Sequence, residues 1–340
     1  MSMRTVLVGC GGISKAWLAM AAKMDDVEIV GLVDLARDAA EAKAKQFGLT
    51  DAIVDTDMAA ALEKTKPEAV FDCTTPEAHA RVTLEAFARG CHVLGEKPMA
   101  DSMANARKMV AAAREAGKIY AVGQQRRYNP QIARLRRFIE SGAIGPLTTV
   151  NCDFYIGAHF GGFRAQMDHV LLIDMAIHTF DAARFISGAD PLSAYCHEWN
   201  PRGSWYAHGA CAQAIFEMTD GIVINYRGSW CSEGLITPWE SQWRVIGENG
   251  SVAWDGRDGL RAQVVGEIKG LIPDYIDVEV PPAEGAPKQD DRYLLMRDFV
   301  DCVRSGGAPK TVCADNIKSL AMVFGAIDSA ESAKKTPIAP

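Results

Sequence analysis

The sequence lacks long hydrophobic runs. No stretch approaches the roughly 18 consecutive apolar residues that cross a bilayer. The first apolar run is short, is broken by glycine and is needed as a strand, so we do not interpret it as a signal peptide. The sequence also contains no internal repeat and no low-complexity segment. We therefore expect a globular, cytoplasmic protein without a membrane partner.

Positive charge is also scarce. The 36 Lys and Arg residues are outnumbered by 43 Asp and Glu residues, which gives a formal net charge of −7. Nucleic acids and anionic membranes are bound through clustered positive charge. The charge balance therefore argues against both as partners.

Paired cysteines are absent as well. The 9 cysteines include no C-x-x-C pair, and their number is odd. Zinc sites and disulfide frameworks normally show paired spacings. We expect reduced cysteines, most of them buried as small apolar side chains, and no metal site.

The first part of the chain shows a regular alternation of strand-like and helical segments. Hydrophobic residues make up 48% of the 340 residues, and the length suggests two domains of roughly 150 residues each. In residues 1–123, short apolar runs alternate with helical patterns, which predicts an α/β domain with a doubly wound parallel sheet. The expected strands are 5–8, 27–33, 53–54, 69–71, 92–94 and 119–122, and the expected helices are 15–24, 37–47, 58–64, 77–89 and 103–116.

Residues 124–340 have a different pattern, because strand-like runs follow one another with few helices between them. This predicts an α+β domain with a large, mostly antiparallel open sheet and helices on one face. The expected strands are 148–155, 192–199, 212–218, 223–230, 242–246 and 278–280, and the expected helices are 130–141, 170–186, 291–305 and 315–333. The boundary between the domains is expected near 123–129.

A glycine-rich turn lies between the first strand and the first helix. Gly9 permits a tight turn, Gly11 lets the backbone approach a pyrophosphate, and the helix N-terminus offers free N–H groups to phosphates. Ser14 stands where the third glycine of G-x-G-x-x-G would be, and it is still small. Asp34 ends the second strand, where an acidic side chain can accept from ribose hydroxyls. The alternative is a plain strand–helix turn.

Two further segments follow strands of the same sheet and are therefore expected at its carboxyl edge. Residues 73–79 follow the strand 69–71, and residues 95–98, Gly-Glu-Lys-Pro, follow the strand 92–94. A nicotinamide ribose would lie at this edge. Lys97 is then a credible catalytic group, with a surface lysine as the alternative.

A third segment pairs a carboxylate with an imidazole. In an α-helix, the four-residue spacing of Asp174 and His178 puts both on one face, about 5–6 Å apart at Cβ, and Asp181 extends that face. A carboxylate can orient an imidazole and raise its pKa. The pair suits acid–base chemistry or a metal, and the alternative is a structural pair.

Together these segments resemble the Gfo/Idh/MocA family, the glucose–fructose oxidoreductase and inositol dehydrogenase group. The resemblance is carried by residues 9–14, by Thr75-Pro76 with His79, by Glu96-Lys97-Pro98 and by the D-x-x-x-H pattern from Asp174 to His178. Residues 128–130 and 243–250 also fit the family pattern. One departure is the approach to the Asp-His helix, where Asp168 and His169 replace a glycine-rich stretch. This extra pair leaves the substrate open and offers an alternative metal site with Asp174 and His178.

The resemblance implies an NAD-dependent oxidoreductase, with NADP possible, that acts on a sugar, inositol or related polyol and forms a homodimer or homotetramer. The residues implied to be catalytic are Lys97, Asp174 and His178. Those expected to bind the cofactor are Gly9, Gly11, Gly12, Ile13, Ser14, Asp34, Thr74, Thr75, Pro76, His79, Glu96, Lys97 and Gln124. Those expected to bind the substrate are Lys97, Tyr155, Arg164, His169, Asp174 and His178.

Two questions about the activity stay open at this point. Asp34 should repel the 2′-phosphate of NADP, although the nearby Arg37 could weaken that preference. The rival functions are a non-catalytic NAD(P)-binding sensor and a metal-dependent lyase or hydrolase on the same scaffold. The particular sugar or polyol and the physiological direction do not follow from the sequence.

Overall fold

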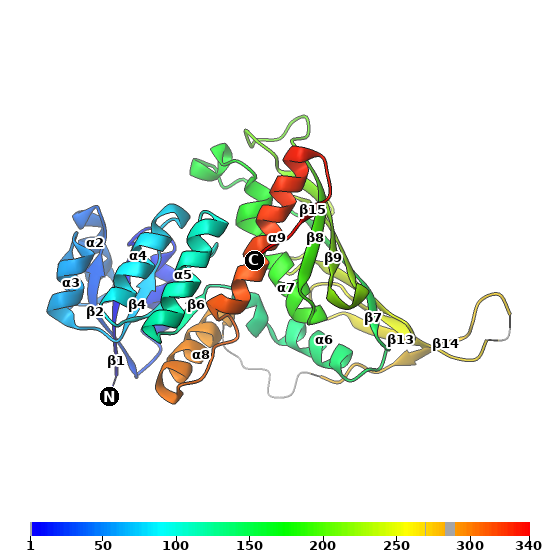
Figure 1. The fold of residues 1–340 in the computed structure, drawn as a ribbon, viewed down its shortest axis with the longest axis horizontal. Helices are drawn as coiled ribbons and strands as arrows, with labels where there is room; N and C mark the ends of the chain where they lie inside the picture. Colours follow the sequence, from blue (N-terminus) through cyan, green and yellow to red (C-terminus); the bar gives the residue numbers. More distant parts are fainter. Residues whose placement is uncertain (1, 269, 283–289) are drawn as a thin grey trace. The chain divides into compact units, whose positions relative to one another are not determined.

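The computed structural model describes residues 2–268, 270–282 and 290–340, which form two compact units (Figure 1). Among these residues, 2–128 and 290–317 belong to the first unit. The second unit comprises 129–268, 270–282 and 318–340. The sequence instead suggested a division into 1–123 and 124–340. The structure differs chiefly because residues 290–317 return to the first unit.

The first unit is built around a parallel sheet with the strand order β3-β2-β1-β4-β5-β6. Its strands are β1 (Met3–Val8), β2 (Val27–Val33), β3 (Ile53–Asp55), β4 (Ala69–Asp72), β5 (His92–Gly95) and β6 (Tyr120–Val122). The helices between them are α1 (Ser14–Ala21), α2 (Arg37–Phe47), α3 (Met58–Thr65), α4 (Pro76–Ala88) and α5 (Met103–Ala116). The order reverses between β1 and β4, which is the switch point where doubly wound sheets bind ligands. The predicted doubly wound α/β fold is confirmed.

Helix α8 (Asp291–Ser305) packs in the core of this first unit. The ring of Phe299 lies 6.3 Å from that of Phe71 on β4, and Phe71 in turn contacts Trp17 of α1 at 5.6 Å. Leu295 is buried in the same cluster. The sequence marks α8 as amphipathic, but periodicity alone does not say which sheet such a helix covers.

The second unit contains a larger sheet with the order β14-β13-β12-β11-β7-β10-β9-β8-β15. Only the pairing of β7 with β10 is parallel among the described strands of this sheet, so the predicted mostly antiparallel sheet is confirmed. The strands are β7 (Leu147–Tyr155), β8 (Pro191–Trp199), β9 (Cys211–Met218), β10 (Val223–Ser229), β11 (Gln242–Gly247), β12 (Gly250–Trp254), β13 (Leu260–Val265), β14 (Tyr275–Val278) and β15 (Thr336–Pro337).

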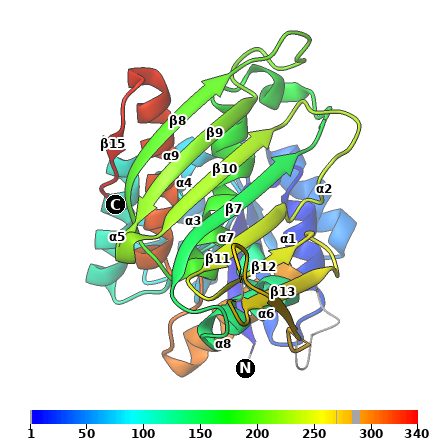
Figure 2. The same ribbon diagram turned by 90° about the vertical axis from the view of Figure 1, so that its right-hand side faces the viewer.

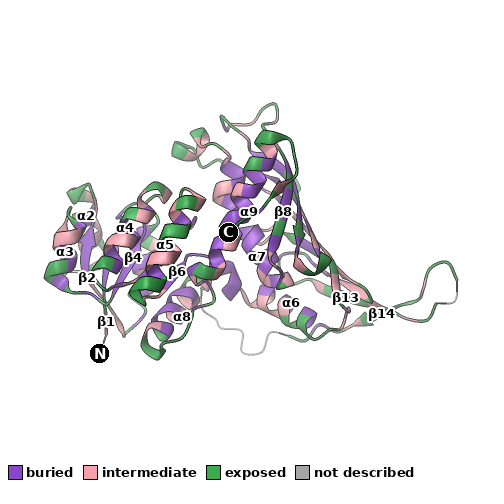
Figure 3. Cartoon of the chain, in the orientation of Figure 1, coloured by how far each residue is buried: buried purple, intermediate pink, exposed green. Residues whose placement is uncertain are grey.

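Helices cover one face of this sheet and leave the other face open (Figure 2). The covering segments include α6 (Pro130–Glu140), α7 (Ile177–Ser187) and the part of α9 (Cys313–Ser332) from residue 318 onward. Phe180 of α7 packs against Phe216 of β9, with ring centroids 4.8 Å apart. Along β9 the buried residues alternate with exposed Gln213, Ile215 and Glu217, as expected for a strand with one face in solvent. The neighbouring strand β8 likewise carries both buried and exposed residues (Figure 3).

None of the helices in the described part of the chain combines the length and the apolar character that a bilayer crossing requires.

Candidate active site

The glycine-rich turn is shaped by a close approach of two strand ends. Gly9 has φ +90°, and a Cβ placed on it would lie 2.7 Å from backbone atoms of Cys73 and Thr74. Both facts require glycine at this position. A Cβ on Gly11 or Gly12 would meet nothing within 4 Å, and both residues are exposed. The backbone at these two glycines is therefore open to a ligand.

Ser14 closes this turn and begins α1. Its buried side chain donates a hydrogen bond from Oγ to the carbonyl of Gly11 at 2.6 Å. No side chain caps the N-terminus of α1, and Ile13 before it is exposed. Uncapped first-turn N–H groups attract anions. The turn thus fits the pyrophosphate of a dinucleotide.

Asp34 is held against the same turn by backbone donors. Its Oδ2 accepts from the N–H of Cys10 at 2.6 Å, and its Oδ1 accepts from the N–H of Ala36 at 2.9 Å. A carboxylate has about four acceptor sites, so two bonds leave capacity for ribose hydroxyls. Arg37, which could have weakened the preference for NAD, pairs with Glu41 at 3.0 Å on the helix surface. The residues at this end of the sheet therefore fit an NAD ribose.

His79 does not present a ring nitrogen to the sheet edge. The buried ring lies 3.0 Å from the carbonyl of Pro98 through Nδ1 and 3.1 Å from the carbonyl of Thr74 through Nε2. It therefore links the two loops that follow β4 and β5. Thr75 is the N-cap residue of α4 and Pro76 its first residue, so both shape the loop through the backbone.

Asp72, at the end of β4, organises the same loop but was missed in the sequence. Its Oδ1 accepts from both the N–H and the hydroxyl of Thr74, at 3.0 and 2.6 Å. Burial raises the pKa of this carboxyl group. An acidic residue at the end of an otherwise apolar strand was the available signal.

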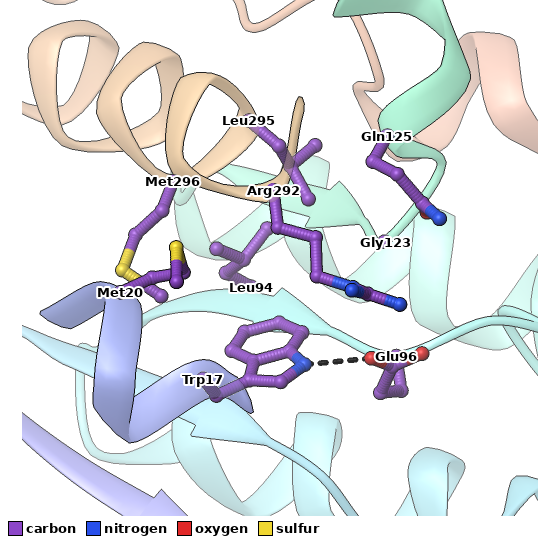
Figure 4. Close-up of a pocket in the computed structure, with 9 residues that line it drawn as sticks. All are labelled: Trp17, Met20, Leu94, Glu96, Gly123, Gln125, Arg292, Leu295 and Met296. Carbon is purple, nitrogen blue, oxygen red and sulfur yellow. Dashed lines mark hydrogen bonds between the residues drawn. The ribbon is translucent and has the colours of Figure 1, made fainter. Parts of the chain in front are cut away.

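The Glu-Lys-Pro segment lies at the carboxyl end of β5, as predicted. Glu96 accepts from Trp17 Nε1 at 2.6 Å through Oε1 (Figure 4). Its Oε2 accepts from the backbone N–H of Lys97 at 3.1 Å. Lys97 is half-buried, and its peptide bond to Pro98 is cis. Gln124 follows β6 and is fully buried. Glu96 therefore fixes the backbone of the candidate catalytic lysine.

A small pocket opens beside this segment (Figure 4). Its wall is mostly apolar and carries a few polar groups from α1, α8 and the ends of β5 and β6. The lining residues are Trp17, Met20, Leu94, Glu96, Gly123, Gln125, Arg292, Leu295 and Met296. All of them belong to the first unit.

In the second unit, the single helix expected at 170–186 is interrupted. Residues Leu171–Ala176 (η3) form a π-helix, and α7 begins only at Ile177. A π-turn contains more residues than an α-turn, so the predicted Cβ separation of Asp174 and His178 does not follow from their spacing. His178 is buried at 8% exposure, and Asp181 accepts a hydrogen bond from Ser319 of α9 at 2.7 Å.

Arg164 and Asp174, two of the predicted substrate-binding residues, contact each other directly. The guanidinium donates from Nε to Asp174 Oδ2 at 2.5 Å and from Nη2 to Asp174 Oδ1 at 3.3 Å. It also lies over the rings of Phe163 and Phe160, at 4.7 and 5.1 Å from their centroids. The side chain of Arg164 remains 32% exposed, whereas that of Asp174 is 11% exposed. The pair fixes the carboxylate while leaving part of the guanidinium accessible.

His169 lies between two carboxylates that the sequence did not suggest. Its Nδ1 is 2.6 Å from Glu198 Oε2 on β8, and its Nε2 is 3.4 Å from Glu331 Oε1 on α9. The hydrogen bond with Glu198 raises the pKa of His169. Asp168 instead pairs with His208 at 3.2 Å. Within the described ranges no group of three or more His, Cys, Asp or Glu residues is arranged to hold a metal ion.

Tyr155 ends β7 on the open face of the sheet. Strand alternation places it with Asp153 and opposite the buried Phe154. Arg227 pairs with Asp153 on that face at 2.6 Å. The structure therefore brings Arg164 together with Asp174 but does not place Tyr155 on the helix-covered face of the sheet.

Comparison with known proteins gives family matches for both parts of the chain. Residues 3–124 match the oxidoreductase family model with an NAD-binding Rossmann fold, and residues 132–253 match the GFO/IDH/MocA C-terminal domain. The 4-carboxy-2-hydroxymuconate-6-semialdehyde dehydrogenase of Sphingobium sp. is 30% identical over 92% of this chain and 94% of the relative. The 1,5-anhydro-D-fructose reductase of Ensifer adhaerens is 25% identical over 98% and 97%. Other relatives are named as apiose, glucoside and inositol dehydrogenases.

A solved structure with the same fold is an oxidoreductase from Agrobacterium radiobacter in complex with NAD+, L-tartaric acid and magnesium. Its TM-score is 0.86 at 22% identity, and the alignment covers 99% of this chain and 98% of the other. At this sequence identity the match shows a shared fold and nothing more. The family models and the relatives show more: this chain belongs to the Gfo/Idh/MocA family of oxidoreductases, with an NAD-binding Rossmann fold as its first domain.

Proposed function

We propose that this protein is an NAD-dependent dehydrogenase of a sugar, inositol or related polyol. A secondary alcohol would be oxidised to a ketone, or an anomeric carbon to a lactone. The observation that carries the proposal is the position of Lys97, which follows β5 at the same sheet edge as the open Gly11–Gly12 backbone. The names of relatives, a sugar reductase and sugar and inositol dehydrogenases, support the substrate class.

The proposed chemistry divides between a hydride and a proton. When bound, NAD supplies the hydride acceptor. His178 removes the proton of the substrate hydroxyl, because an imidazole suits reversible proton transfer near neutral pH. Lys97 donates a hydrogen bond to the reacting oxygen and stabilises its developing negative charge. Asp174, fixed by Arg164, orients a substrate hydroxyl or the His178 ring.

A carboxylated substrate is the second candidate, because of Arg164. A guanidinium has five N–H donors, and only two of them are used for Asp174. The remaining donors, on a side chain that is 32% exposed, suit a carboxylate. The relative from Sphingobium sp. is named for a carboxylated semialdehyde, and this name also favours a carboxylated substrate.

We also propose that the protein assembles as a homodimer or homotetramer through the open face of the second sheet. That face carries exposed apolar side chains on β8 and β9, namely Leu192, Tyr195 and Ile215. Exposed apolar patches of this kind mark contact surfaces. Light scattering that shows only a 36.8 kDa monomer in dilute solution would rule the assembly out.

The function is tested by a substrate panel with NAD, followed by nicotinamide absorbance. The panel contains inositols, aldoses, anhydrosugars and glycosides, with uronic acids as the carboxylated arm. Reduction of NAD by a neutral polyol supports the first proposal, and reduction only by uronic acids supports the second. Cofactor binding without turnover of any compound favours a non-catalytic sensor. Metal analysis of the purified protein tests the remaining alternative, a metal-dependent lyase or hydrolase, which a bound metal ion would favour.

A further inference from the structure

Helix α8 carries three arginines, and they differ in their partners. Arg297 and Arg304 both pair with Asp26, Arg297 through a 2.7 Å contact to Oδ1 and Arg304 through a 2.5 Å contact to Oδ2. For Arg292, no hydrogen bond or ion pair of the guanidinium is found with any residue that the structure describes. Its side chain is exposed. Neither burial nor an ion pair therefore explains why an arginine stands at position 292.

The position of Arg292 within α8 is also electrostatically unfavourable. The helix begins at Asp291, so Arg292 lies in its first turn. The N-terminus of a helix carries a partial positive charge, which favours acidic side chains and opposes basic ones. A bound anion near Arg292 would add to the negative charge that Asp290 and Asp291 supply at this end of the helix.

The side chain of Arg292 reaches from α8 toward the carboxyl edge of the first sheet. Figure 4 shows its guanidinium extending over Trp17 toward Glu96, with Gln125 on the opposite side. Trp17 lies in the first turn of α1, the helix that begins at the glycine-rich turn. Arg292 is therefore placed where the sheet edge receives its ligand.

The surroundings leave the guanidinium available to a ligand. Glu96 is the carboxylate of this pocket, and its two oxygens already accept from Trp17 Nε1 and from the N–H of Lys97. Leu94, Leu295 and Met296 form an apolar wall that keeps water from one side. A charge-assisted hydrogen bond is stronger beside such a wall than in bulk water.

We propose that Arg292 binds the pyrophosphate of the dinucleotide and so completes the cofactor site from α8. The pyrophosphate is the anionic group of NAD, and a guanidinium matches phosphate oxygens in geometry as well as in charge. The glycine-rich turn supplies backbone donors, and Arg292 adds a full positive charge. This also gives α8 a function in the first unit. The inference rests on the cofactor half of the proposed function and not on the polyol.

The test is an equilibrium titration with NADH, followed by its fluorescence, without any substrate. Arg292→Gln should raise the Kd for NADH about tenfold, the size expected for one charge-assisted hydrogen bond. Arg292→Lys should retain part of the affinity, because it keeps the charge but not the planar fork. Lys45→Gln is the matched control. It removes one positive charge from the exposed last turn of α2, at the opposite edge of the sheet, and should leave the Kd unchanged.

Two competitors locate the contact within the cofactor. ADP-ribose contains the pyrophosphate and should lose affinity for Arg292→Gln by the same factor as NADH, whereas adenosine should not. The melting temperature without ligand should not fall, since the guanidinium of Arg292 has no hydrogen-bond or ion-pair partner among the described residues. Unchanged NADH affinity in Arg292→Gln, or an equal loss for adenosine, would overturn the inference. So would an effect confined to the KM of the sugar or uronic acid, because Arg292 would then bind substrate.

The outcomes separate this inference from the proposed function. If NADH binding depends on Arg292 but no polyol or uronic acid is oxidised, the inference stands and the proposed function fails. If a polyol reduces NAD while Arg292→Gln binds NADH normally, the function stands and the inference fails.

Discussion

The indole N–H of Trp17 donates to Oε1 of Glu96 at 2.6 Å and thereby ties the first turn of α1 to the end of β5. The other carboxylate oxygen of Glu96 accepts from the backbone N–H of Lys97 at 3.1 Å. A single carboxylate therefore connects the glycine-rich turn with the candidate catalytic lysine. Removing its indole partner should disturb both stability and cofactor binding.

Trp17→Phe keeps an aromatic ring but removes the donor. Leaving one oxygen of a half-buried carboxylate without its partner should lower the free energy of unfolding by about 1–3 kcal/mol, measured by urea denaturation. NADH affinity should fall as well. Trp243→Phe is the control, because Trp243 is equally buried and donates to the backbone carbonyl of Glu240 at 2.7 Å in the second unit. If both variants bind NADH equally well, Trp17 does not support the cofactor site.

The contact between Arg164 and Asp174 predicts a kinetic effect. Arg164→Gln should lower kcat/KM for a neutral polyol by about 10²-fold, because a misplaced positioning group typically has an effect of this size. Arg136→Gln is a close control. Arg136 pairs with Glu140 at 2.6 Å, lies over the ring of Phe185 and is 34% exposed. Equal kinetics in the two variants would show that Arg164 does not fix Asp174 for the reaction.

The environment of His169 predicts a pH dependence of stability. Its hydrogen bond with Glu198 raises its pKa in the folded state, so the charged imidazole contributes stability. This contribution is fully present below the unfolded-state pKa of about 6.5 and is lost as pH rises through the higher folded-state pKa. His169→Asn should therefore destabilise the protein at pH 5.5–6 and much less in alkaline solution. Asn suits the φ of +50° at this position. A destabilisation that is constant with pH would contradict this account.

Asp34 predicts a preference between cofactors. Its carboxylate should repel the 2′-phosphate, so catalytic efficiency with NAD should exceed that with NADP by about tenfold or more. Asp34→Asn should reduce this ratio, whereas Asp55→Asn, at the end of the neighbouring strand β3, should not. The measurement is kcat/KM with each cofactor. A clear preference for NADP in the unmodified protein would make the assignment of Asp34 wrong.

Local sequence patterns predicted the strands and helices of the first unit well. Gly9, Ser14 and Asp34 lie within one strand–helix–strand unit, so their spacing alone places them at one sheet edge. The Glu-Lys-Pro segment was predicted at the same edge because it follows the strand 92–94, and the structure places it there.

Two kinds of feature were not predicted from the sequence: contacts between side chains that are distant along the chain, and a local irregularity within one helix. His169 contacts Glu198 and Glu331, which lie on β8 and α9. The π-helix at Leu171–Ala176 arises within a segment whose apolar pattern is that of an ordinary α-helix. The pairing of Glu96 with Trp17 joins residues 79 positions apart. Periodicity reports which face of an element is buried, but not which distant side chain it meets.

In the proposed mechanism, Lys97 and His178 act on the reacting oxygen of a polyol that is oxidised with NAD. The most direct measurement is steady-state turnover of His178→Ala and Lys97→Ala on the polyol identified by the panel, together with an NADH titration of each variant. Loss of a positioned general base typically lowers the rate about 10²–10⁴-fold, so kcat should fall by that amount for His178→Ala and strongly for Lys97→Ala while NADH still binds. Near-normal turnover in both variants would contradict the assigned roles and would make another group, with His169 the first to examine, the base.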